Sequence, residues 1–313
     1  MRKWLPAARP NSMAATVIAF INFKGGVGKT SNVVNLGACL AKHHRRRVLI
    51  VDLDAQCNAT FWLLRPSQWE RLQTERTRTV TQVFLDHSIG TRLFDFEAAV
   101  LRGLPWSDAG FSHIPSLDLL PTTVELLEAE ERLHRQSIQP FFKVLRTVLQ
   151  PWRQSYDYIL LDCPPNVYGV TKNALFFADY YVVPYIPDYL SLSGLRTFTR
   201  LIQTFQDQVS GHRGGRLGSR LAGVIVNRYK KVGNVFAQSL DELKLMMNDL
   251  RADKLIHEKA AVLAPAVRDC VSLAECTNVH LPVIIHKDHA NSSQDYGLLT
   301  DSFLQHFEAT LAS

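Results

Sequence analysis

Short apolar runs alternate with segments of helical spacing along most of the chain. The runs typical of buried strands are residues 17–21, 48–51, 158–161, 181–184, 221–226 and 283–285. Apolar residues recur every three or four positions in residues 32–43, 141–149, 192–205 and 236–250, which predicts helices there. Continuous apolar strands separated by helices are typical of a mostly parallel, twisted sheet with helices on both faces. The pattern therefore predicts an α/β fold in a single domain.

Three segments depart from this alternation. Residues 65–115 are mixed in charge and predict helices and loops inserted into the same domain. Residues 1–14 predict a flexible N-terminal extension ahead of a domain that spans 15–313, with Met13 as an alternative start to Met1. Residues 210–220 are rich in Gly and Arg, which predicts a mobile surface loop.

Composition narrows the class of protein. The net charge of +6 favours a polyanionic partner. No apolar run reaches the roughly 18 residues of a membrane-spanning helix. The five cysteines include no C-x-x-C pair, which favours reduced thiols over disulfides or a zinc site. We therefore expect a cytoplasmic protein with no stable membrane association.

A glycine-rich loop follows the first predicted strand. Residues 23–31 read Phe-Lys-Gly-Gly-Val-Gly-Lys-Thr-Ser and lead into the first predicted helix. Glycines lack a Cβ atom, so backbone N–H groups can surround phosphate oxygens, and the helix N-terminus adds positive potential. Lys29 adds a fixed cation, and the hydroxyl of Thr30 suits Mg²⁺. The loop predicts phosphate binding, although Phe23 replaces the usual first glycine and Lys24 adds a second lysine.

Carboxylates follow two further predicted strands. Asp52 and Asp54 leave the second strand, and alternation along a strand places them on one side. Ligands bind at the carboxyl edge of such sheets, so we expect both to reach the phosphate region. Asp162 ends the third strand in the Walker B manner and suits Mg²⁺. The three segments together predict a nucleotide hydrolase.

These segments resemble the ParA/MinD group of deviant-Walker P-loop ATPases, and above all its ParA/Soj partition branch. The matching parts are K-G-G-x-G-K-T at 24–30, D-x-D-x-Q-x-N-x-T at 52–60, D-x-P-P at 162–165, Pro184 followed by S-x-x-G-L at 191–195, and the strand end Asn227-Arg228. The resemblance covers roughly residues 15–60 and 155–300. It departs from the family at His280, where the family has glycine, and at Asp269 and Ser272, where partition ATPases often have basic residues.

The resemblance implies a role for each site residue. Lys24, Lys29 and Asp54 are implied as catalytic, with Lys24 reaching the nucleotide of a second subunit and Asp54 activating water. Mg²⁺ is assigned to Thr30, Asp54 and Asp162. The residues expected to bind ATP are Lys24, Gly25, Gly26, Val27, Gly28, Lys29, Thr30, Ser31, Asn227 and Arg228. Asn227 is implied to read the adenine edge.

The implied function is an ATP-dependent cycle on the nucleoid. ATP would close a sandwich homodimer that binds DNA non-specifically, and a ParB-like protein or cargo adaptor would stimulate hydrolysis and release. The cycle would segregate plasmid or chromosome DNA, or position a protein cargo. Candidate DNA contacts are Arg213, Arg216, Arg220, Lys230, Lys231, Arg251, Lys254 and Arg268.

Other members of the same loop class fit less well. A membrane-cycling ATPase like MinD is the alternative, but the amphipathic C-terminal segment 297–309 carries Asp and Glu and no Lys or Arg. A reductase like the nitrogenase iron protein needs a second cluster cysteine to accompany Cys163, and none fits. A tyrosine kinase of this class typically has a tyrosine-rich tail, which is absent.

Overall fold

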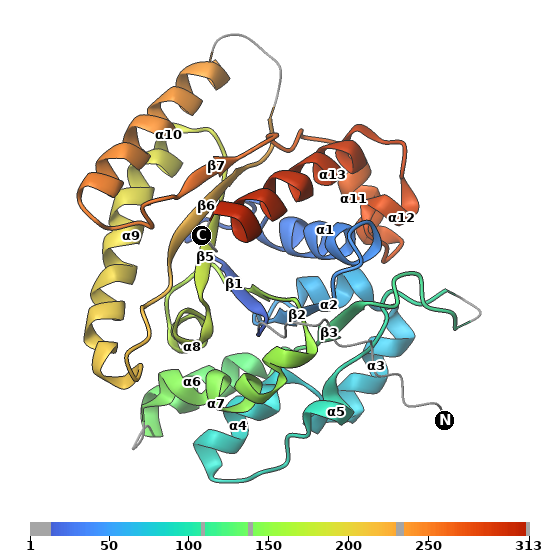
Figure 1. The fold of residues 1–313 in the computed structure, drawn as a ribbon. Helices are drawn as coiled ribbons and strands as arrows, with labels where there is room; N and C mark the ends of the chain where they lie inside the picture. The colour runs from blue at the N-terminus through green and yellow to red at the C-terminus, as the bar shows by residue number, and fades with distance from the viewer. Residues whose placement is uncertain (1–13, 108–109, 137–139, 230–234, 311–313) are drawn as a thin grey trace.

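A seven-stranded parallel sheet forms the centre of the protein in the computed structural model, which describes residues 14–107, 110–136, 140–229 and 235–310 (Figure 1). The strands are β1 (Thr16–Phe20), β2 (Val48–Asp52), β3 (Leu117–Leu120), β4 (Tyr158–Asp162), β5 (Tyr180–Tyr185), β6 (Arg220–Val226) and β7 (Ala261–Leu263). Their order is β3-β2-β4-β1-β5-β6-β7, and every pairing is parallel. All strands therefore end at one edge of the sheet.

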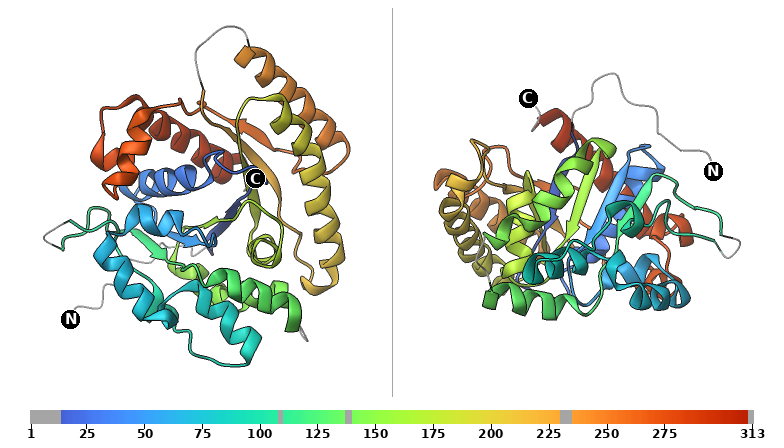
Figure 2. Two further views of the ribbon diagram at one scale, coloured as in Figure 1. Left: turned by 180° about the vertical axis from the view of Figure 1, so that it is seen from behind. Right: turned by 90° about the horizontal axis from the view of Figure 1, so that it is seen from below.

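Helices cover both faces of this sheet (Figures 1 and 2). One face packs against α1 (Lys29–Lys42), α2 (Asn58–Leu63), α3 (Pro66–Thr74), α11 (Val271–Asn278), α12 (Val283–His286) and α13 (Asn291–Leu304). The other packs against α4 (Val80–Ile89), α5 (Phe96–Ala99), α6 (Leu126–Gln136), α7 (Val144–Leu149), α8 (Gly169–Phe177), α9 (Tyr189–Gln208) and α10 (Val235–Ala252). The 3-10 segments η1 (Arg76–Arg78), η2 (Phe141–Lys143), η3 (Gln150–Ser155) and η4 (Ser210–His212) and the π segment η5 (Gln305–Thr310) complete the chain.

Alternation along the strands divides the core between the two faces. In β1, Ile18 and Phe20 are buried on the α1 side, whereas Val17 and Ala19 are buried on the α8 side. All four side chains are fully shielded from solvent. A strand buried on both faces needs a continuous apolar run, which is why the runs in the sequence identified the central strands.

The α/β fold prediction is confirmed, with three errors in its elements. Residues 283–285 are not a strand: they form helix α12, which begins after Pro282 and packs against α1. A short apolar run does not distinguish a strand from a buried helical turn. Strands β3 and β7 were not predicted, because each has only four or three residues and lies at a sheet edge.

The segment predicted as an insertion, 65–115, is built into the core. It contains α3, η1, α4 and α5, and α4 packs against α6 and α7. Val80, Val83 and Phe84 of α4 are buried in the same core as β1 and β4. The extension predicted for 1–14 lies, except for Ala14, outside the described residues.

The structure also describes all five cysteines, which are free thiols, four of them buried. The described residues contain no cluster of His, Cys, Asp or Glu suited to a metal ion. No helix in the described parts of the chain has the length and apolar character needed to cross a bilayer.

Candidate functional site

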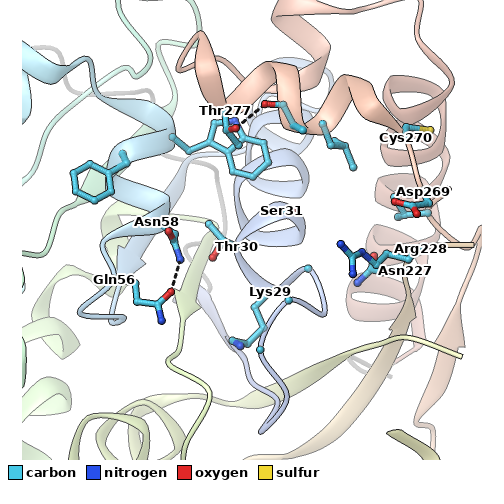
Figure 3. Close-up of a pocket in the computed structure, with 18 of the residues that line it drawn as sticks. Lys29, Thr30, Ser31, Gln56, Asn58, Asn227, Arg228, Asp269, Cys270 and Thr277 are labelled. Atoms are coloured by element: carbon cyan, nitrogen blue, oxygen red, sulfur yellow. Dashed lines mark hydrogen bonds between the residues drawn. The ribbon is translucent and has the colours of Figure 1, made fainter. Parts of the chain in front are cut away.

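The loops that leave β1, β2, β4 and β6 meet at the carboxyl edge of the sheet and surround an open cavity of about 570 Å³. The residues that line it are Gly25, Gly26, Gly28, Lys29, Thr30, Ser31, Asp54, Gln56, Asn58, Phe61, Trp62, Pro165, Asn227, Arg228, Val267, Arg268, Asp269, Cys270, Leu273, Ala274, Thr277, His280 and Tyr296. Figure 3 shows Lys29, Thr30 and Ser31 at the start of α1, with Gln56 and Asn58 on one side and Asn227 and Arg228 on the other.

The glycine loop between β1 and α1 depends on two of its glycines. Gly26 and Gly28 have φ angles of 73° and 91°, in the left-handed region that disfavours residues with a side chain. A Cβ atom on Gly28 would also come 3.0 Å from Nδ2 of Asn227. The loop can therefore expose backbone N–H groups only if both positions stay glycine.

Lys29 and Thr30 line the floor of the cavity, and Asp162 is buried directly behind Thr30. The Thr30 hydroxyl donates a hydrogen bond of 2.7 Å to Oδ2 of Asp162. Asp162 is fully buried, and its Oδ1 has no hydrogen-bond partner among the described residues. Burial raises the pKa of Asp162 well above its usual value, and burial lowers the pKa of Lys29. A buried carboxylate oxygen without a partner is costly, so this arrangement suits a cation.

The two aspartates after β2 have different surroundings. Oδ2 of Asp52 accepts hydrogen bonds from the backbone N–H (2.8 Å) and hydroxyl (2.7 Å) of Thr60, and burial raises its pKa to about 7. Asp52 thus anchors α2 and does not line the cavity, so the expectation that it faces the phosphate region is wrong. Asp54 does line the cavity, and its Oδ1 accepts a hydrogen bond of 3.0 Å from the N–H of Gln56.

Lys24 lies at the outer end of the glycine loop and is held towards α9. Its Nζ is 2.6 Å from Oδ2 of Asp188, and its N–H donates to Oδ1 of Asn22 at 3.0 Å. The neighbouring Phe23 packs edge-on against Phe198 of α9, with ring centroids 4.6 Å apart. The Lys24 side chain is 43% exposed, so it stays accessible from outside the subunit.

Asn227 and Arg228 form the opposite wall, close to Asp269 and Cys270 (Figure 3). Nδ2 of Asn227 donates to the carbonyl of Val27 at 2.8 Å, which leaves its buried Oδ1 without a partner in the described part of the chain. Arg228 is exposed and has a φ of 56°. The amide of Asn227 therefore ties β6 to the glycine loop and keeps one acceptor unused.

Part of the cavity wall was not predicted from the sequence. Its residues are Phe61 and Trp62 of α2, Leu273, Ala274 and Thr277 of α11, and His280 just beyond α11. His280, which stands where the family has glycine, adopts a left-handed φ of 57°, and its Nδ1 lies 2.6 Å from the carbonyl oxygen of Phe61. That mismatch was the one available signal, because the other positions look like ordinary apolar helix residues.

The candidate DNA contacts lie in two separate places. Arg268 lines the cavity and pairs with the buried Asp295 at 2.6 Å, so it helps to form the wall and is not a free surface cation. The other described candidates lie at the amino edge of the sheet. Arg213 and Arg216 follow α9, Arg220 begins β6, Arg251 lies in the last turn of α10, and Lys254 follows α10. Lys230 and Lys231 lie outside the described residues.

The predicted mobile loop at 210–220 is partly anchored. Arg213 is only 3% exposed, and its guanidinium donates to the carbonyls of Leu175 and Phe176. Arg216 pairs with Asp179 at 2.8 Å. The expectation of a mobile surface segment is therefore wrong for Arg213, because its side chain packs inside the protein.

One family model and several known proteins match this chain over most of its length. The model of a family described as AAA domain matches residues 15–212. An uncharacterized protein of Pseudomonas putida is 30% identical over 90% of this chain and 92% of its own length. The sporulation initiation inhibitor protein Soj of Bacillus subtilis is 29% identical over 90% of this chain and 94% of its own length. The chromosome partitioning protein ParA of Myxococcus xanthus is also 29% identical, over 90% of this chain and 84% of its own length.

Solved structures share the same fold. Apo McdA of Cyanothece has a TM-score of 0.67 at 18% identity, over 92% of this chain and 99% of its own. A plasmid partition protein of Borrelia burgdorferi bound to AMPPNP has a TM-score of 0.63 at 19% identity, over 94% of this chain and 99% of its own. Cobyrinic acid a,c-diamide synthase of Mycobacterium smegmatis, bound to an ATP analog and magnesium, has a TM-score of 0.68 at 26% identity, over 94% of this chain and 96% of its own.

Proposed function

The chain belongs to the ParA-type family of P-loop partition ATPases, and we propose that it hydrolyses ATP with Mg²⁺ as part of a DNA-partition or cargo-positioning cycle. The observation that carries this proposal is the floor of the cavity. Thr30 and Asp162 are joined under a glycine loop, and one oxygen of Asp162 has no partner among the described residues. The related synthase binds an ATP analog and magnesium, which supports the same ligands here.

The residues on this floor fit Mg²⁺ and a triphosphate. Thr30 and Asp162 would hold Mg²⁺, which would offset phosphate charge when bound. Lys29, buried beside Asp162, would neutralise further phosphate charge. Asp54 lines the cavity and would orient a water molecule and accept its proton. The unused Oδ1 of Asn227 would accept a hydrogen bond from the amino group of adenine.

The position of Lys24 supports a dimer as the active form of the proposed ATPase. In the single chain it pairs with Asp188 outside the cavity, with part of its side chain exposed. We propose that ATP draws two copies together through their carboxyl edges, where Lys24 of each copy contacts the phosphates bound by the other. A charge-assisted contact of this kind offsets the repulsion between two triphosphates.

The dimer would act on DNA in the cytoplasm, associated with the nucleoid. The net charge of +6 supports a polyanionic partner, and a ParB-like protein or cargo adaptor would stimulate hydrolysis and release. A MinD-like membrane cycle has less support, because three large apolar residues of the C-terminal segment 297–309 are already buried. Leu299, Phe303 and Phe307 all pack in the core with α1.

Two measurements test the proposal. ATP turnover with Mg²⁺ should be lost in Asp54→Ala with nucleotide binding kept, whereas Asp207→Ala, on the exposed side of α9, should behave like the wild type. Retention on DNA of unrelated sequence at moderate salt should require ATP. Equal retention with ATP, ADP and no nucleotide would contradict the proposed cycle, and turnover undiminished in Asp54→Ala would contradict its catalytic role.

A further inference from the structure

Four arginines lie close together at the amino edge of the sheet, opposite the nucleotide cavity. Arg153 of η3 and Arg216 share Asp179, at 2.6 Å and 2.8 Å. Arg146 of α7 and Arg213 lie over the same ring, that of Phe176, at 5.6 Å and 4.8 Å from its centroid. Among the described residues, neither Arg146 nor Arg213 forms an ion pair with a carboxylate. We call Arg146, Arg153, Arg213 and Arg216 the arginine cluster.

The cluster has unsatisfied hydrogen-bond donors. Nε of Arg213 and Nη1 of Arg216 are buried and have no acceptor in the described part of the chain. Burial, followed by the charges of Arg216 and Arg146, lowers the pKa of Arg213 to about 10. Burial and the charges of Arg216 and Arg153 likewise lower the pKa of Arg146. Arg146 and Arg216 keep part of their side chains exposed, so this positive charge reaches the surface, where an added anion stabilises it.

Further cations flank the cluster along the same edge. Arg45 is exposed just before β2, Arg220 begins β6, and Lys254 is exposed beyond the end of α10. The strand order places β2 and β6 four positions apart, which is about 19 Å at the usual strand spacing. Duplex DNA carries one phosphate charge per roughly 1.7 Å of its axis, so an edge of this width faces several phosphates.

We propose that this amino edge, centred on Arg146 and Arg216, contacts the phosphate groups of DNA. The inference rests on the proposed DNA-dependent function and gives it a surface. Guanidinium groups form bidentate hydrogen bonds with phosphate oxygens. Such contacts do not distinguish between bases, as non-specific binding requires. Two copies joined at their carboxyl edges would present this surface on the two outer sides of the dimer, away from both nucleotides.

The test compares two double variants with the same loss of charge. Arg146→Gln/Arg216→Gln changes the cluster, whereas Arg200→Gln/Lys244→Gln removes exposed cations from α9 and α10. Binding of an unspecific 24-bp duplex is measured by fluorescence anisotropy with ATP, from 50 to 200 mM salt. The cluster variant should bind at least about tenfold more weakly, and its log–log salt slope should be smaller by about 1.8. The control should keep the wild-type slope, and basal ATP hydrolysis should be unchanged in both.

The other outcomes separate this inference from the proposed function. If the wild type binds DNA with ATP and both double variants bind alike, the surface is wrong and the function stands. If the wild type hydrolyses ATP without binding DNA, both the DNA partner and this surface are wrong. Binding to phosphatidylglycerol vesicles in place of DNA, lost in the cluster variant, would overturn DNA as the partner. If Arg216→Gln unfolds, Arg45→Gln/Arg146→Gln applies the same test at more exposed positions.

Discussion

The sharpest test of the proposed dimer is Lys24→Gln. In the single chain Lys24 forms an exposed ion pair with Asp188 at 2.6 Å. Exposed pairs contribute at most about 1 kcal/mol, so the variant should unfold within a few degrees of the wild type. If Lys24 acts only within its own subunit, dimers should persist in this variant, because little else changes.

A contact across the dimer predicts a far larger effect. Hydrogen bonds to charged groups contribute about 1.5–3 kcal/mol each, and a symmetric dimer loses two of them. The loss of about 3–6 kcal/mol corresponds to roughly a 10²- to 10⁴-fold weaker dimer. Nucleotide binding by the monomer should change little, because Lys24 is not one of the residues that line the cavity described above.

Sedimentation velocity measures this directly, with ATP present and the Asp54→Ala background used to prevent turnover. A matched control is Lys244→Gln, which breaks an exposed ion pair with Asp241 of 3.3 Å on α10. Dimers of Lys24→Gln that form within tenfold of the wild-type affinity would refute the role across the interface. A large fall in melting temperature would show instead that Lys24 stabilises its own subunit.

Three further changes probe the site. The native state keeps a proton on Asp52 up to pH about 7, whereas the unfolded chain loses it near pH 3.8, so the unfolding free energy should fall as pH rises between these values. Asp52→Asn should flatten this pH dependence in urea titrations. An unaltered pH dependence would show that it comes from other titratable groups. Asn227→Ala should bind ATP about tenfold more weakly and lose its preference over GTP in competition with a fluorescent nucleotide, whereas an intact preference would remove Asn227 from base recognition. Phe23→Ala loses the edge-on contact with Phe198 and should lower stability by about 1 kcal/mol in thermal melts; no change would show that the contact does not anchor the loop.

The central strands could be predicted from the sequence because they are buried on both faces of the sheet. β1, β2, β4, β5 and β6 need continuous apolar runs, and those runs are visible without a structure. Edge strands lack this requirement, so β3 and β7 left too short a pattern to detect. The run 283–285 has the same composition as a strand, and only the turn set by Pro282 and packing on α1 make it helical.

The candidate site shows a similar division. Residues whose expected role depends on backbone geometry or fixed spacing, such as the glycine loop and Asp162, could be predicted from their motifs. The pair of Lys24 with Asp188 joins positions 164 residues apart, and the position of Asp52 depends on Thr60 folding back as the start of α2. Alternation placed Asp52 and Asp54 on one side, but the chain leaves the strand after Asp52, so alternation no longer applies at Asp54.

Asp52 connects Asp54, which lines the cavity, to helix α2 through hydrogen bonds. Asp52 holds the N–H and hydroxyl of Thr60 and accepts the N–H of Asp54, so one buried carboxylate fixes both the start of α2 and the backbone of the residue that faces the cavity. The Thr60 hydroxyl in turn accepts the N–H of Thr122, just beyond β3. A displacement of Asp54 on nucleotide binding would therefore be transmitted to α2, whose Phe61 and Trp62 line the far wall of the same cavity. Asp52 is thus the residue that couples Asp54 to the helix beside it.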